Sequence, residues 1–250
     1  MIALSIAGFD PSGGAGILSD IKTFHAMGVY GTAVITVLTA QNPKRVEFIE
    51  AVSSDLIEKQ IDTIIEEYPI KFGKTGMLFN KENVKLVSEK IIEHNLQIVV
   101  DPVMIAGCGA ELSVEGYVAA LKKYLLPNAT IVTPNIDEAE MLSGQTIESV
   151  DDAVDVAIKL GEICDVVVTG GNLKGSNILF DGTLKVIKGD LIESENVHGT
   201  GCSFSAAVTA GLSKNYDLTR SVEDAVKFVK NSVKYGRWGT LDHFHKHKLV

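Results

Sequence analysis

The chain has 250 residues, of which 46% are hydrophobic and 22% are charged, and its formal net charge is −9. That length is enough for one large domain or at most two, while the acidic balance and the lack of a Lys- or Arg-rich run exclude a nucleic-acid-binding face. Three widely spaced cysteines, Cys108, Cys164 and Cys202, form no CxxC pair, so neither a zinc site nor a disulfide framework is predicted.

The expected location is the cytoplasm. The apolar run at residues 2–7 lacks the basic flank and the length of a signal peptide. No uncharged apolar segment approaches membrane-spanning length, so no membrane partner is expected.

The chain opens with a strand, a glycine-rich loop and a helix, predicted over residues 2–7, 8–16 and about 17–27. This order is typical of nucleotide-binding folds, but the glycine spacing is not GxGxxG, so the Rossmann fingerprint is rejected. The loop either wraps a small ligand with its backbone or is a plain turn. Asp10 is either a hydrogen-bonding partner of that ligand, which we favour, or an N-cap.

A second strand is predicted over residues 31–40, and Gln41 follows its carboxyl end, where ligands bind in open α/β sheets. The Gln41 amide either pairs with a heterocycle there or is a solvated loop amide. After an amphipathic helix over residues 54–68, a third strand ends near Met77, which is either a core residue or an apolar wall for a flat ring. Residues 73–75 (GKT) imitate a P-loop tail, but Tyr68 stands where that motif requires glycine, so a Walker A loop is rejected.

A helix over residues 81–94 leads to an apolar strand that ends at Asp101. A helix over residues 116–126 and a short strand over 130–133 follow. Asn135 and Glu138 are three residues apart at the start of the next helix and share one face of it. Ordinary N-terminal capping is an equally good interpretation of this pair.

The C-terminal half continues the alternation, with a helix over residues 149–162 and a strand over 165–168 that ends at Thr169. Residues 181–182 (DG) then predict a hairpin between strands 177–180 and 183–187. The last helix is expected over residues 219–235, and the histidine-rich residues 242–247 are interpreted as a surface tail with weak adventitious metal affinity. The prediction is one three-layer α/β (αβα) domain over residues 1–250, with a mostly parallel sheet and an antiparallel edge.

The stretch around which the chain is organised is residues 198–202 (HGTGC), which opens a helix of small residues. The first turn of a helix leaves backbone N–H groups unpaired and favours negative charge, and glycines allow an anion to approach. Gly199, Thr200 and Gly201 are therefore a candidate cradle for a phosphate or oxyanion, with Cys202 at its mouth. A cysteine there is expected to have a lowered pKa and to serve as a base or nucleophile. The alternative is a simple helix cap with a small buried cysteine.

Taken together, these residues resemble the ribokinase-like superfamily and, within it, the hydroxymethylpyrimidine/phosphomethylpyrimidine kinases of thiamine biosynthesis. The resemblance covers nearly the whole chain. It is carried by motifs at residues 7–17 (AGFDPSGGAGI), 39–42 (TAQN), 74–78 (KTGML), 101–104 (DPVM), 133–140 (TPNIDEAE), 198–202 (HGTGC) and 243–245 (HFH).

This resemblance implies an ATP- and Mg²⁺-dependent kinase that phosphorylates 4-amino-5-hydroxymethyl-2-methylpyrimidine and then its monophosphate. It implies that Gln41 pairs with the aminopyrimidine and that Cys202 stands where related kinases of this fold carry a catalytic aspartate. The remaining implied roles are ring-pocket and substrate residues Gly8, Asp10, Met77 and Val103, metal residues Asp101 and Glu138, phosphate and nucleotide residues Asn135, Thr169, Gly171 and Lys174, and the anion hole from Gly199 to Cys202.

The chain departs from the family pattern at two places. Residues 105–109 (IAGCG) lack the usual flap lysine, and residues 169–172 (TGGN) replace the usual KGGH. Two phosphate-neutralising cations are therefore missing at matched positions, and Lys174 is the nearby candidate to compensate. We expect the second phosphorylation, whose acceptor is already charged, to suffer most.

Two other functions compete with this one. A pyridoxal/pyridoxine kinase shares the fold and acts on a similar hydroxymethyl group, but Cys202 after Gly201, and Gln41 within residues 39–42 (TAQN), favour the pyrimidine. A non-catalytic pyrimidine sensor is the alternative from another class. Since related enzymes are often dimers, a homodimer is expected.

Overall fold

The structure is a computed structural model that describes residues 1–105, 109, 114–170, 173 and 175–245. Its strands are β1 (Ile2–Phe9), β2 (Tyr30–Asn42), β3 (Arg45–Ala51), β4 (Phe72–Thr75), β5 (Gln97–Val100), β6 (Ile131–Val132), β7 (Asp165–Val168), β8 (Ser176–Phe180) and β9 (Leu184–Lys188). Its α-helices are α1 (Gly16–Ala26), α2 (Ser54–Glu67), α3 (Lys81–Glu93), α4 (Tyr117–Ala120), α5 (Ile136–Ser143), α6 (Val150–Leu160), α7 (Thr200–Ser213) and α8 (Leu218–Lys234). A π-helical turn (Leu121–Leu125) and a 3₁₀ turn (Leu126–Asn128) extend α4.

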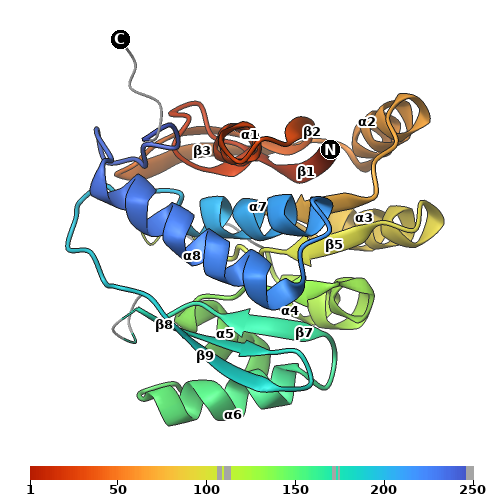
Figure 1. Cartoon of the computed structure of the whole chain (residues 1–250). Helices are drawn as coiled ribbons and strands as arrows, with labels where there is room; N and C mark the ends of the chain where they lie inside the picture. Colours follow the sequence, from red (N-terminus) through yellow and green to blue (C-terminus); the bar gives the residue numbers. More distant parts are fainter. Residues whose placement is uncertain (106–108, 110–113, 171–172, 174, 246–250) are drawn as a thin grey trace.

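The described strands form one sheet in the order β3-β2-β1-β4-β5-β6-β7-β8-β9 (Figure 1). From β2 to β7 every neighbouring pair is parallel. β3 at one edge, and β8 and β9 at the other, pair antiparallel. The predicted mostly parallel sheet with an antiparallel edge is therefore confirmed, and that edge is formed by β8 and β9.

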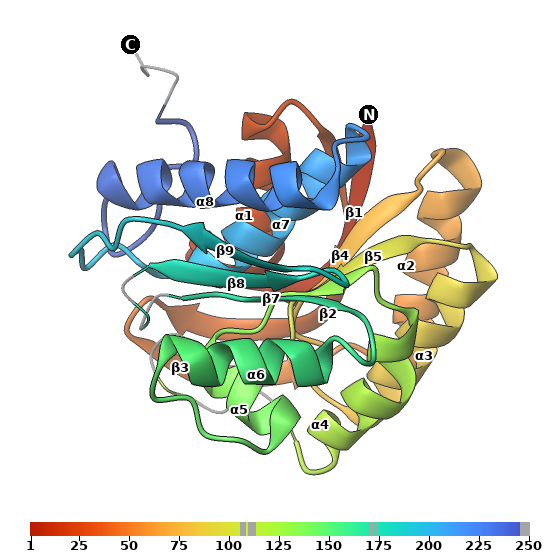
Figure 2. The same cartoon turned by 60° about the horizontal axis from the view of Figure 1, so that its bottom comes forward.

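Helices cover both faces of the sheet, and the layers are clearest in Figure 2. Helices α1, α7 and α8 lie on one face, and α2 to α6 lie on the other. The pleat divides the core accordingly, because successive side chains of a strand point to opposite faces. In β5, Val100 joins the apolar cluster that includes the α3 and α6 side chains, whereas Val99 joins the cluster beneath α7 and α8.

Most predicted elements are confirmed to within a few residues, but β3 is missed. Residues 45–51 mix polar and apolar side chains at the sheet edge, and Phe48 is 59% exposed. Burial produces the continuous apolar runs that identify the central strands, and an exposed edge strand lacks that signal.

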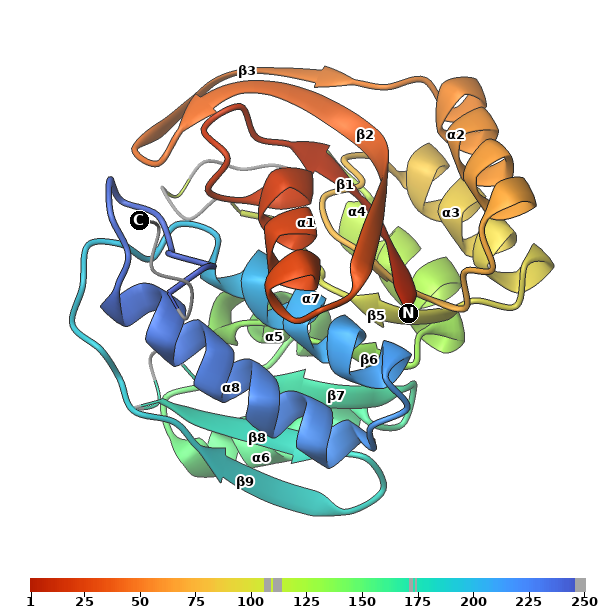
Figure 3. The same ribbon diagram turned by 45° about the horizontal axis from the view of Figure 1, so that its top comes forward.

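Figure 3 shows β2 and β3 curving together past the end of β1, so the β2–β3 turn reaches the same edge of the molecule as the glycine-rich loop.

Among the described helices, none is both long and apolar enough to cross a membrane.

Candidate active site

One cavity of about 700 Å³ opens at the carboxyl ends of the parallel strands. The ends of β1, β2 and β4 to β7 contribute to its lining, and so does the first turn of α7. This is the edge at which ligands bind in open α/β sheets. The cavity brings together every predicted site residue that the structure describes: Gly8, Asp10, Gln41, Met77, Asp101, Val103, Asn135, Glu138, Thr169, Gly199, Thr200, Gly201 and Cys202. Gly171 and Lys174 lie outside the described residues.

The first turn of α7 is open toward this cavity. Gly199 is the N-cap at φ 86°, in the left-handed region, and no side chain caps the helix. A Cβ on Gly199 would lie 1.8 Å from the Gly14 carbonyl oxygen, so only glycine fits there. At Gly201 a Cβ would meet nothing within 4 Å. The fold therefore does not demand glycine at 201, and the space in front of it is available to a ligand.

Cys202 lies in that turn, but the expected lowering of its pKa is wrong. Burial raises the pKa of the Cys202 thiol, and the carboxylates of Asp101 and Asp20 raise it further. The Lys74 ammonium and the backbone amide of Gly16 act in the opposite direction without reversing the shift. A position at a helix N-terminus does not lower the pKa of a thiol when the effect of desolvation is larger than the effect of the helix.

Lys74 is the main functional candidate that the sequence reasoning missed. It lies in β4, is fully buried, and its Nζ is 3.1 Å from Asp20 Oδ1 and 3.3 Å from Asp101 Oδ2. Although burial alone would lower the pKa of Lys74, these two carboxylates raise it, so the ammonium stays charged beside Cys202. The rejection of a Walker A loop is consistent with this position in a strand. The sequence signal was a lysine in a predicted central strand, because a buried lysine requires buried counter-charges.

Asp101 and Glu138 form a buried acidic pair. Asp101 Oδ2 accepts hydrogen bonds from Lys74 and, at 3.0 Å, from Ser205 Oγ of α7. Burial raises the pKa of Glu138 to about 8, and the Asp101 charge contributes to that increase. Asn135 and Glu138 also form a capping box at the start of α5, with Glu138 N to Asn135 Oδ1 at 2.9 Å and Asn135 N to Glu138 Oε2 at 3.0 Å. The capping interpretation is thus confirmed, while both residues still line the cavity.

Asp10 joins the glycine-rich loop to the α7 turn. Its Oδ2 is 2.8 Å from His198 Nε2 and accepts from Ala15 N at 2.9 Å, and its Oδ1 accepts from Ser12 N at 2.8 Å. Burial alone would raise the pKa of Asp10, but the hydrogen bonds from His198 and Ser12 lower it. An ionised carboxylate only accepts hydrogen bonds, so His198 Nε2 carries the proton. The loop therefore packs against the cradle and is more than a plain turn.

The opposite wall is apolar. Met77 and Val103 belong to one small cluster with Val37, and Gly8 would place a Cβ 3.5 Å from Met77 Sδ. Met77 is therefore both a core residue and a wall of the cavity, so its two interpretations are compatible. Gln41 is partly buried beside this wall and lines the same cavity.

A sequence model described as phosphomethylpyrimidine kinase matches residues 10–246. The chain belongs to the phosphomethylpyrimidine kinase family. It is 40% identical to the hydroxymethylpyrimidine/phosphomethylpyrimidine kinase of Rhizobium meliloti, over 98% of this chain and 97% of the relative. The chain is accordingly a phosphotransferase of that family.

Solved structures of family relatives share the fold. A phosphomethylpyrimidine kinase from Clostridium difficile is 37% identical, with a TM-score of 0.82 over 92% of this chain and 97% of that one. A pyridoxal kinase from Staphylococcus aureus in complex with ADP is 32% identical, with a TM-score of 0.90 over 99% of this chain and 95% of that one. The ribokinase-like fold expected from the sequence is therefore confirmed.

In this kinase-family chain, the prediction of a surface tail at residues 242–247 is wrong for His243. His243 is 4% exposed, and its Nε2 is 3.0 Å from both Ser19 Oγ and Ser203 Oγ. His247, at the far end of the same run, is outside the described residues. The described part of this segment packs against the back of the α7 turn.

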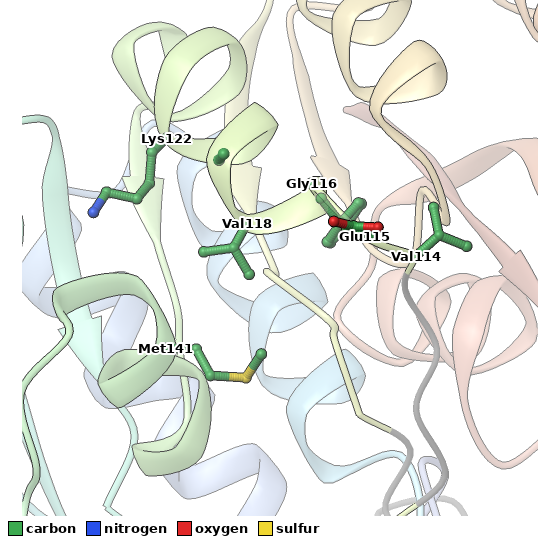
Figure 4. A pocket seen from close by; sticks show the side chains of 8 residues that line it. Val114, Glu115, Gly116, Val118, Lys122 and Met141 are labelled. Atoms are coloured by element: carbon green, nitrogen blue, oxygen red, sulfur yellow. The ribbon is translucent and has the colours of Figure 1, made fainter.

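A second cavity of about 490 Å³ lies away from the site of this kinase, between α4 and α5. Figure 4 shows Val118 and Lys122 on one side of it and Met141 on the facing helix. None of the predicted site residues that the structure describes lines this second cavity.

Proposed function

We propose that this chain transfers the γ-phosphoryl group of ATP to the hydroxymethyl oxygen of 4-amino-5-hydroxymethyl-2-methylpyrimidine, and then phosphorylates the monophosphate to the diphosphate. The observation that carries the proposal is the shared cavity. It joins an apolar wall and an amide, Met77, Val103 and Gln41, to an uncapped helix N-terminus at Gly199–Cys202. A flat aminopyrimidine fits the first set, and a transferring phosphoryl group fits the second.

The charge of the cavity supports a requirement for Mg²⁺. Its described lining contains five carboxylates, Asp10, Asp101, Asp137, Glu138 and Asp190, but only one lysine, Lys230, which is paired with Asp190. ATP is a polyanion, so its binding here needs a divalent cation. No cluster of three metal-ligating side chains occurs among the described residues. Two carboxylates, with water and phosphate oxygens completing the shell, are the ligands that Mg²⁺ prefers in kinases.

Asp101 and Glu138 are the side chains that would hold this ion. The raised pKa of Glu138 reflects the cost of two neighbouring buried carboxylates, which a cation removes. When bound, Mg²⁺ neutralises charge on the phosphate oxygens during transfer.

The chain's own groups then position the reactants and move one proton. Backbone amides of the α7 turn hold the phosphoryl oxygens as the hydroxymethyl oxygen forms a bond to phosphorus and the bond to ADP breaks. The hydroxyl proton passes to the thiolate form of Cys202, which becomes the thiol. Because the thiol pKa is raised, the thiolate is a minor form at neutral pH. A loose transition state tolerates this, since it demands little nucleophile activation.

An apolar strip at the other end of the cavity is the proposed adenine site. Leu191, Val197, Val226 and Val229 line it, and Leu191 and Val197 are more than half exposed without a ligand. Exposed aliphatic side chains in a cleft favour the face of a base. Thr169 lines the same cavity, but its N–H and hydroxyl both donate to the Pro134 carbonyl. Thr169 is therefore expected to contact the nucleotide through backbone or van der Waals interactions, and not by donating its hydroxyl proton.

Pyridoxal is the second candidate substrate. The Staphylococcus aureus relative and a Bacillus subtilis relative that is 36% identical are both named pyridoxal kinase. Pyridoxal also offers a ring-bound hydroxymethyl group to an apolar wall. Discrimination then depends on whether the Gln41 amide meets an aminopyrimidine edge.

Incubation of the purified protein with ATP·Mg²⁺ and either ring, followed by mass spectrometry of the products, tests the proposal. We expect the pyrimidine monophosphate to form with a kcat/KM well above that for pyridoxal. A higher kcat/KM for pyridoxal would mean that pyridoxal, and not the pyrimidine, is the substrate. If neither ring caused ATP consumption, the protein would be a non-catalytic sensor.

The second phosphorylation is expected to be the slower one. Its acceptor carries a phosphate, and the described cavity lining has no unpaired lysine to meet it. Time courses of monophosphate and diphosphate separate the two steps. A diphosphate rate equal to the monophosphate rate would contradict the expectation.

A further inference from the structure

The first turn of α7 has a backbone hydrogen bond of its own, from Ser203 N to the Gly199 carbonyl at 2.9 Å, but this bond does not attach the turn to the rest of the molecule. Gly199 has no side chain, sits in the left-handed region, and α7 has no side-chain cap. Catalysis by oriented amides requires those amides to be fixed to within about 0.5 Å. Something outside the helix must therefore position residues 199–202.

A buried triangle of polar groups lies directly behind this turn. His243 Nε2 is 3.0 Å from Ser203 Oγ and 3.0 Å from Ser19 Oγ, and the two hydroxyls are 2.9 Å apart. Both serines are fully buried, and Ser203 follows Cys202 in the sequence. The triangle joins α7 to α1 through a residue that comes after α8.

The same segment contacts the turn a second time through its backbone. His198 N–H donates to the Gly239 carbonyl at 3.2 Å, and Gly239 N–H donates to Asn196 Oδ1 at 2.8 Å. On its other side, a Cβ on Gly14 would lie 2.6 Å from Thr240 Cγ2, so the segment is also packed against the glycine-rich loop. Residues 236–243, which we term the C-terminal brace, thus hold the turn both from the front, at His198, and from behind, at Ser203.

The uncharged state of the His243 imidazole favours a rigid C-terminal brace. Burial lowers the pKa of His243 to about 4, with a further contribution from the Lys22 charge, while Asp242 opposes it. The imidazole is neutral at physiological pH and forms hydrogen bonds with serine hydroxyls, which both donate and accept. Buried, satisfied networks of this kind rigidify the elements that they join.

We propose that His243 is a positioning residue for phosphoryl transfer, acting through Ser203 to fix the α7 amides and the Cys202 thiol. The proposal rests on the proposed function, because the turn is assigned there as the phosphoryl site. His243 does not line the cavity and touches no substrate.

Two variants test this role in the full chain. His243→Phe removes both hydrogen bonds, and we expect kcat to fall about a hundredfold, the loss typical of a reacting group misplaced by about 1 Å, with an unchanged KM for the pyrimidine. His243→Gln places an amide nitrogen near the position of Nε2 and is expected to recover most of kcat. Equal kcat in the Phe variant and the unaltered protein would overturn the proposal, as would equal losses in the Phe and Gln variants.

Hydrogen–deuterium exchange of the ligand-free protein provides a readout that does not depend on the substrate. In His243→Phe, amides of residues 199–203 are expected to exchange at least about tenfold faster, while residues 206–213 of α7 keep their protection. Unchanged exchange at 199–203 would also overturn the proposal, even if the proposed substrate proved wrong.

Ser88→Ala is the matched control for loss of buried hydrogen bonds. Ser88 lies in α3, away from the cavity, where it donates to the Tyr124 carbonyl at 2.6 Å and accepts from Asn128 Nδ2 at 3.2 Å. We expect its kcat and the exchange at residues 199–203 to match the unaltered protein. A drop in kcat equal to that of His243→Phe would mean that general destabilisation explains both, and would count against positioning.

Discussion

Two helix N-termini border the same cavity and are built in opposite ways. At α5, Asn135 and Glu138 satisfy each other's backbone amides, so the end is closed and presents a carboxylate. At α7, a glycine in the left-handed region leaves the end uncapped. Helix ends attract anions only while their amides remain available.

The difference between the two helix ends indicates that they bind different groups. The closed end of α5 places a second carboxyl group next to Asp101, and a bound cation would hold both groups in their charged form. The open end of α7 supplies donors without charge, which suits the transferring phosphoryl group. Self-capping makes α5 locally stable, whereas the geometry of α7 depends on Asp10, through His198, and on the C-terminal brace.

Gly201→Ala tests whether the open end of α7 receives the phosphoryl group. Its methyl group would enter the open space in front of the α7 turn, so we expect kcat to fall up to about a thousandfold, as when an oxyanion-hole donor is lost. The free energy of unfolding should stay the same or rise by up to about 1 kcal/mol, because alanine favours a helix. Steady-state kinetics and chemical denaturation measure both quantities. An active variant would show that the turn does not receive the phosphoryl group.

Acid should weaken the attachment of the α7 turn to the C-terminal brace. His243 has a pKa of about 4 in the folded chain and about 6.5 unfolded, so the unfolded chain binds the proton first as the pH falls. The contribution is full above pH 6.5 and is lost between 6.5 and 4, amounting to about 3 kcal/mol of unfolding free energy. Urea unfolding at each pH measures the slope, which His243→Gln should flatten. An unchanged slope would show that other groups dominate.

Cys202→Ala tests the chemistry at the open end. We expect kcat to fall about a hundredfold, the usual contribution of a proton acceptor, while the dissociation constant of the pyrimidine is largely unchanged. In the unaltered protein, kcat should rise with pH through neutrality, because the raised thiol pKa makes the thiolate scarce. Cys202→Asp should level this profile at a lower pH. Unchanged turnover in the alanine variant would refute the assigned role.

The smallest expected effect is at the closed end. Glu138→Gln keeps an oxygen for the capping box but removes the charge, so stability should hold while the Mg²⁺ concentration for half-maximal rate rises about tenfold. Magnesium titrations of the rate measure this. Asn135→Ala is the matched control, expected to cost about 1 kcal/mol of stability through the lost cap. A Mg²⁺ requirement unchanged by Glu138→Gln would remove Glu138 from the metal site.

Local sequence signals predicted the sheet and the positions of the site, because buried parallel strands have continuous apolar runs and ligands bind at their ends. The turn at residues 198–202 (HGTGC) was also predictable, because glycines beside the start of a helix are a signal that neighbouring residues alone provide. The pKa of Cys202 was not predictable, because it depends on burial and on the charges of Lys74 in β4, Asp20 in α1 and Asp101 just after β5. Lys74 and His243 were missed because their partners are distant in sequence.

The hydrogen bond between Ser19 and His243 spans 224 residues, and that between Asp10 and His198 spans 188. Contacts of such separation make folding slow, because large loops must close before they contribute. On a ribosome that adds about 5–20 residues per second, the glycine-rich loop would wait at least about ten seconds for the histidines that hold it. Nascent chains of this protein should therefore acquire most of their sheet well before they acquire a finished catalytic centre.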